Sequence, residues 1–99
     1  MNLTRYRSPT SDETEISFPA LECWNPMTEV ATIAAQVNKK RVLCRISSEI
    51  LRERFQASPE EPMQAVAANR PAIEAAARKL IENEAYEEDG SITIRRTDI

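Results

Sequence analysis

The side chains best suited to bind a ligand in this chain are basic. A stretch of sixteen residues holds six of them: Lys39, Lys40, Arg41, Arg45, Arg52 and Arg54. Only two acids, Glu49 and Glu53, share that stretch. Lysine ammonium groups and forked arginine guanidinium groups bind phosphate and carboxylate. The stretch therefore indicates binding of an anion or of an acidic partner.

Side-chain alternation predicts which of these cations share a surface. From position 41 to 46, apolar and basic residues alternate, as in a strand with one buried face. The inward residues would be Val42, Cys44 and Ile46. If the alternating segment 91–96 lies alongside, one open face carries the candidate anion- or partner-binding residues Lys39, Lys40, Arg41, Arg45 and Arg95. The simpler alternative is a solvated sheet face. No aromatic residue interleaves with these arginines, which argues against stacking of bases.

Two further charged groups have simpler explanations. The acids are Glu82, Glu84, Glu87, Glu88 and Asp89. They lack the alternating spacing around a glycine that a calcium loop needs, so we interpret them as a solvated helix end. Arg70 can pair with Glu74 or reach a carboxylate at the core edge. We favour capping by Asn69 and Arg70 at the break that Pro71 imposes.

Several kinds of active site are excluded by composition. The chain has no histidine, one glycine, and two cysteines that form no C-x-x-C pair. Histidine-dependent nucleophiles, tetrahedral zinc sites and glycine-rich phosphate loops are therefore absent. We predict no catalytic, cofactor-binding or metal-binding residue, and expect that the protein is not an enzyme. Cys44, on the apolar side of its strand, is expected to be a small buried hydrophobe.

Length and composition predict one small soluble domain. The 99 residues are 41% hydrophobic and 29% charged, with a net charge of −3. Residues 1–14 are polar and are expected to form a flexible tail, and residues 15–99 a single α+β domain. Neither a secretory signal nor a membrane-spanning run is present, so we expect a cytoplasmic protein that binds no membrane.

The periodicities predict an α+β fold in the order β-β-β-α-α-β. Strands are expected near residues 16–18, over 30–37 and over 41–46, with a hairpin at the polar tetrad Asn38 to Arg41. A short amphipathic helix should follow Ser47 or Ser48. A helical pattern from Met63 is kinked or broken at Pro71.

The longest helix is expected from Pro71 to Tyr86, with Asp89-Gly90 as its terminator before a closing strand. The fold would be a single-layer antiparallel or mixed sheet of about four strands, packed against two or three helices.

Three segments resemble a known bacterial family. They are CRISSEIL (Cys44 to Leu51), ANRPAIEAAARKLIENEAY (Ala68 to Tyr86) and the strand after Gly90. On these, residues 16–98 resemble domain of unknown function 1488. The resemblance implies a small α+β protein without an established activity, and no catalytic residue is carried over. Relatives tend to have a glycine in the first hairpin and no proline where Pro71 stands.

Two functions follow as hypotheses. The first is a non-catalytic protein-interaction or regulatory module whose partner is an unknown protein or a second copy in a homodimer. The alternative is a nucleic-acid-associated accessory protein, similar to a transcription regulator, that binds through the basic sheet face. An enzyme with a carboxylate acid–base site ranks last.

Overall fold

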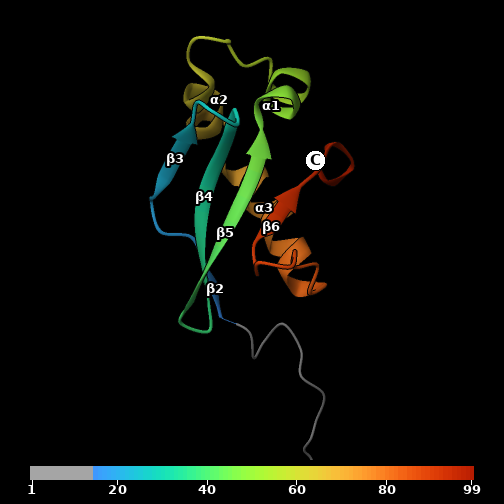
Figure 1. Cartoon of the computed structure of the whole chain (residues 1–99). Coiled ribbons are helices and arrows are strands. Elements are labelled where there is room, and N and C mark those ends of the chain that lie inside the picture. The colour runs from blue at the N-terminus through green and yellow to red at the C-terminus, as the bar shows by residue number, and fades with distance from the viewer. Residues whose placement is uncertain (1–14) are drawn as a thin grey trace, which may run out of the picture.

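A computed structural model describes residues 15–99, and the tail predicted for residues 1–14 lies outside this range. Figure 1 shows a mixed sheet with helices gathered on one side. The strands are β2 (Ile16–Ser17), β3 (Glu22–Asn25), β4 (Val30–Val37), β5 (Lys40–Ser47) and β6 (Ile92–Ile94). The helices are α1 (Ser48–Phe55), α2 (Pro62–Ala68), α3 (Arg70–Glu82) and a 3-10 turn, Arg96–Asp98. The predicted α+β class is confirmed, with β3 as an additional strand.

The centre of the sheet is the hairpin of β4 and β5. These strands are antiparallel, and Val37 stands opposite Lys40. The two loop residues, Asn38 and Lys39, have φ values of 51° and 74°. Positive φ at both loop positions matches the twist of the flanking strands, and asparagine tolerates it well. β2 and β3 both pair with the outer edge of β4, and β6 runs parallel to β5.

The alternation predicted for β5 is confirmed. Val42, Cys44 and Ile46 are at most 7% exposed, whereas Arg41 and Leu43 point to the other side and are exposed. The helices cover the face that bears the buried residues. The largest fully buried side chains there are Ile33, Ile46, Leu51, Ile73, Ile92, Ile94 and Val66.

The helical segment differs from the prediction at two points. The helix breaks at Asn69, but the Asn69 side chain donates to the carbonyl of Ala65 (2.9 Å) at the end of α2 and makes no capping hydrogen bond to the start of α3. α3 ends at Glu82, not at Tyr86, because Glu84 adopts a left-handed φ of 55°. Gly90, with φ 86°, forms a separate turn before β6. No helix within residues 15–99 is long and apolar enough to cross a membrane.

Arg70 holds the start of α3 against the sheet edge, so the favoured capping role is wrong. Its guanidinium donates to Glu74, to Glu22 of β3 and to the carbonyl of Pro19, each at 2.7 Å. The side chain is only 15% exposed. A partly desolvated arginine whose fork is fully engaged orders its neighbours more firmly than an exposed pair does.

Candidate partner-binding face

One face of the sheet has no helix on it within residues 15–99 (Figure 1). We call it the uncovered face. The strand register places Cys23, Thr32, Arg45 and Thr93 in one row across it. The next row contains Ala34 and Leu43, and the row beyond it Gln36 and Arg41. Antiparallel sheets often leave one such face in water, and its outward side chains are then usually polar.

The middle of the uncovered face is apolar instead. Leu21 and Leu43 are 47% and 40% exposed. They border a shallow depression of about 260 Å³, together with Cys23, Ala34 and Arg41. Exposed apolar side chains that gather around one hollow are typical of interaction sites, whereas scattered ones are not.

A second hollow lies at the hairpin end of the same strands. It measures about 540 Å³, and Lys40, Arg41 and Tyr86 are among the residues that line it. β6 pairs only with residues 44–46 of β5, so residues 40–43 have no strand beside them on that edge within the described chain. Arg41 borders both hollows and therefore connects the basic hairpin end to the apolar centre.

The five cations predicted to share a face fall into two groups. Lys39, Lys40 and Arg41 are exposed and form no ion pair with any residue from 15 to 99. Arg45 and Arg95 instead bind Asp89 at 3.1 Å and Glu87 at 3.3 Å. The two acids come from the loop after α3, which was interpreted as a solvated helix end. Of these five cations, the three without an ion-pair partner among residues 15–99 thus lie at the hairpin. Only Arg41 of these three has the strand parity of the uncovered face, because Lys39 belongs to the turn and Lys40 has the parity of Val42.

Asp89 links the loop after α3 to β5 through hydrogen bonds. Its carboxylate accepts from the hydroxyl (2.6 Å) and the backbone N–H (3.0 Å) of Ser91, and also from Arg45. These hydrogen bonds lower the pKa of Asp89 to about 2, because they stabilise the charged form. Ser91 is 4% exposed and also accepts from Arg45 (2.9 Å).

The two thiols lie on opposite faces of the sheet. Cys23 is exposed on the uncovered face, and Cys44 is buried beneath the helices. Burial raises the pKa of the Cys44 thiol to about 11, so this group stays protonated at neutral pH. Over residues 15–99, no group of three or more metal-ligating side chains comes together.

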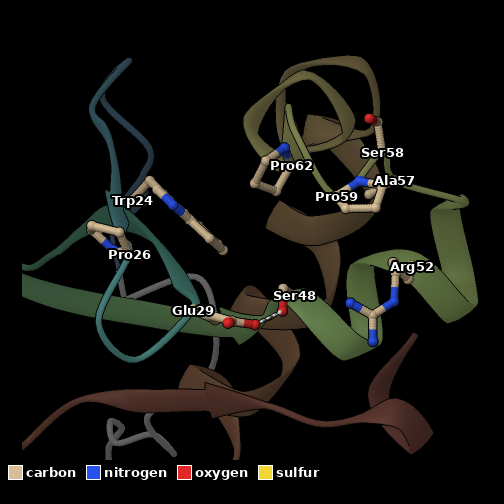
Figure 2. Close-up of a pocket in the computed structure, with 9 residues that line it drawn as sticks. All are labelled: Trp24, Pro26, Glu29, Ser48, Arg52, Ala57, Ser58, Pro59 and Pro62. Atoms are coloured by element: carbon tan, nitrogen blue, oxygen red, sulfur yellow. Dashed lines mark hydrogen bonds between the residues drawn. The ribbon is translucent and has the colours of Figure 1, made fainter.

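The sequence analysis did not foresee a slot at the end of the sheet. It measures about 220 Å³ and lies between Trp24 and the loop that joins α1 to α2 (Figure 2). Pro26, Pro59 and Pro62 form walls, and Glu29, Ser48 and Arg52 lie beneath them. The only tryptophan and the prolines of the loop were visible in the sequence, but their proximity depends on the tertiary fold.

Comparison with known proteins identifies the relatives of the chain. A family model described as Protein of unknown function (DUF1488) matches residues 16–94. A similar solved structure is that of a protein of unknown function from the same family in Shewanella loihica PV-4. The TM-score is 0.75 at 26% identity, over 82% of this chain and 92% of that one. None of the curated proteins matches.

Proposed function

We propose a function from the surfaces of this chain itself, because it belongs to DUF1488, a family described only as proteins of unknown function. The proposed role is that of a non-catalytic module that binds a partner protein on the uncovered face. The partner contributes a segment that is both apolar and acidic.

One observation carries this proposal: Arg41 borders the apolar depression and also belongs to a group of cations that form no ion pair among residues 15–99. The apolar part, around Leu21 and Leu43, supplies area whose removal from water favours association. Arg41 on this face, with Lys39 and Lys40 at the adjoining hairpin, selects an acidic partner over a basic one. A second copy of this chain suits the face less well, since its own uncovered face presents the cation Arg41 again and not an acid.

The absence of the usual catalytic groups supports a binding role. The whole sequence lacks histidine. Cys44 is buried, with a raised pKa, so it is a poor nucleophile. Most side chains of the uncovered face are aliphatic, hydroxyl-bearing or cationic, joined by the amide of Gln36 and the exposed thiol of Cys23, and this mixture suits recognition.

The test begins with capture from a bacterial lysate, followed by identification and purification of the bound protein. Its affinity is then measured by calorimetry against the wild-type chain, Leu43→Asp and Arg41→Glu. We expect each substitution to weaken binding by about tenfold or more, since each places a mismatched charge in the contact. Lys79→Glu, a charge reversal on exposed α3, is the matched control and should bind normally. Equal affinities for all four proteins would contradict the proposal.

Nucleic acid is a second candidate, and the three clustered cations of the hairpin favour it. With Arg45 and Arg95 held by acids, only about three phosphates would be neutralised, giving a salt slope near −2.7. A mobility assay with a short DNA or RNA duplex at low salt tests this. A complex lost in Lys40→Glu with Arg41→Glu would support the nucleic-acid alternative, and the absence of any complex would remove it.

A further inference from the structure

We propose that the partner's segment binds as an added β-strand along the free edge of β5, beside residues 40–43. The inference rests on the proposed function and deepens it, since it names the form in which the segment is recognised. The segment is extended and carries two acidic residues next to two apolar ones. Its main chain pairs with β5, and its side chains reach both the hollow at the hairpin end and the margin of the uncovered face.

The edge of β5 carries unpaired backbone groups beside these residues. The loop of two residues makes its flanking residues, Val37 and Lys40, a hydrogen-bonded pair. Backbone groups then alternate in direction along the strand, so those of Arg41 and Leu43 point away from β4. Figure 1 shows β6 beside only the later part of β5. The N–H and C=O of Arg41 and the N–H of Leu43 therefore have no hydrogen-bonding partner among residues 15–99.

The loop after α3 lies near this edge but does not supply the missing partners. Its backbone pairs with itself, because the N–H of Gly90 donates to the carbonyl of Glu87 (2.9 Å) and the N–H of Glu87 donates to that of Ser91 (2.7 Å). The carboxylate of Asp89 accepts from Ser91 and from Arg45. Unpaired groups along a strand edge are a template for another extended chain, whose main-chain hydrogen bonds then supply affinity.

The hollow of about 540 Å³ gives the added strand room. It is lined by Lys40, Arg41 and Val42 of β5, and by Tyr86 and Gly90 from the chain after α3. Tyr86 is 41% exposed, so its ring can cover an apolar side chain of the segment. No atom lies within 4 Å of the position that a Cβ on Gly90 would occupy, so a second main chain can approach closely there.

The order of residues along β5 sets the sequence of the segment. Lys40 and Arg41 are basic, and the next two residues, Val42 and Leu43, are apolar. Neighbouring residues point to opposite faces, so each face of the edge offers one cation and then one apolar side chain. An acid opposite each cation and an apolar residue opposite each of the others match both faces. Asp89 also lines the hollow, but an arginine of β5 already binds it at 3.1 Å.

Amide hydrogen exchange, followed by NMR for each residue, tests the edge in the free protein. The N–H groups of Arg41 and Leu43 should exchange about tenfold or more faster than that of Val42, which points to β4. Slow exchange at all three positions would overturn the proposal. If that slow exchange depended on protein concentration, a second copy would occupy the edge, and otherwise another part of the chain would.

The binding probes are two peptides of opposite order, acetyl-Thr-Glu-Glu-Val-Val-Thr-amide and acetyl-Thr-Val-Val-Glu-Glu-Thr-amide, because an added strand can run parallel or antiparallel to β5. We expect the peptide of the correct order to shift the amide signals of Arg41 and Leu43 saturably, and to slow their exchange by about tenfold or more at saturation. No saturable shift with either peptide at millimolar concentration would overturn the proposal.

The preference for acids is tested by replacing both glutamates of the bound peptide with lysines, which should weaken binding by about tenfold or more. Lys40→Gln combined with Arg41→Gln should remove this preference. Lys79→Gln, an exposed change on α3, is the matched control and should retain it. A double variant that still prefers the acidic peptide as the wild type does would refute the match of charges.

N-methylation of the peptide separates edge pairing from contact with the uncovered face alone. Methyl groups on two adjacent central nitrogens remove one N–H that faces β5 in either register, so binding should be lost. A methylated peptide that binds equally well would refute the added strand. Shifts of the Leu21 and Leu43 side chains without slower exchange at the edge would also refute it. The proposed function would survive both results, since calorimetry with the intact partner tests it separately.

Discussion

The two faces of the sheet are built from alternate residues of the same strands, yet they differ in how far their apolar side chains are buried. Under the helices, Ile33, Cys44 and Ile46 are at most 1% exposed and form part of the core. On the uncovered face, Leu43 remains 40% exposed between Arg41 and Arg45. The comparison shows that burial explains the apolar residues of the covered face, whereas it does not explain Leu43, and this difference is what the proposed partner-binding role addresses.

The cysteines give the largest expected contrast between the faces. Cys23 should react with a thiol reagent in the native protein. Cys44 is buried and mostly protonated, so it should react only in molecules whose core has opened. For a domain of ordinary stability, we expect the second thiol to react at least about a thousandfold more slowly.

Release of the coloured leaving group of an aromatic disulfide reagent measures both phases. Cys23→Ser should abolish the fast phase alone, and denaturant should expose both thiols. Two equally fast thiols in native buffer would mean that the covered face is not packed as described.

Truncation of two β5 residues, one on each face of the sheet, compares what each face contributes to the free energy of unfolding. Ile46→Ala should cost about 2–4 kcal/mol of unfolding free energy, because it leaves a cavity beneath the helices. Leu43→Ala should cost less than about 1 kcal/mol, since the site is open to water. Urea denaturation of both variants checks this. Similar losses for both would contradict the assignment of core and surface.

Arg70 tests a polar contact at the edge of the covered side. Arg70→Ala removes three hydrogen bonds from a side chain that is 15% exposed, so we expect a loss of about 1–3 kcal/mol. Arg41→Ala, the matched change on the uncovered face, should alter the unfolding free energy by less than about 0.5 kcal/mol. Denaturant midpoints distinguish the two variants. An Arg70→Ala protein with an unchanged midpoint would show that the three hydrogen bonds of Arg70 do not stabilise the fold.

The carboxylate of Asp89, which accepts from Arg45 of β5, predicts a small effect of pH on stability. Its folded pKa, about 2, lies below the ordinary value of 3.8, so its contribution to stability is complete above about pH 3.8 and disappears as the pH falls towards 2. Asp89→Asn should therefore flatten the decline in urea midpoint over this interval. Glu88→Gln, which alters the adjacent exposed acid, should keep the decline, and an unchanged profile in Asp89→Asn would contradict the pKa shift.

Local patterns were enough to predict the central part of the fold. The alternation over residues 41–46 identified the covered and uncovered sides of β5, because a strand has a period of two. The hairpin predicted at the polar tetrad Asn38 to Arg41 is present, and Asn38 adopts positive φ in its turn. These features depend on neighbours in the sequence, so the sequence contains the information that sets them.

Features that gave no clear local signal, or that depend on distant segments, were not predictable in the same way. The end of α3 was misplaced because Glu84, a residue that rarely signals a left-handed turn, adopts that conformation. The pairing of Arg45 with Asp89 depends on where the loop after α3 returns to the sheet. The slot beside Trp24 forms only when the turn after β3 meets the loop between α1 and α2.

The most direct test of a partner-binding face is the alkylation rate of Cys23 with and without the purified partner. Cys23 borders the apolar depression and Cys44 does not, so one thiol reports on the face and the other on unfolding. We predict that saturating partner slows iodoacetamide modification of Cys23 by about tenfold or more, as expected when a contact excludes water and reagent. An unchanged Cys23 rate in the saturated complex would place the partner elsewhere and contradict the account.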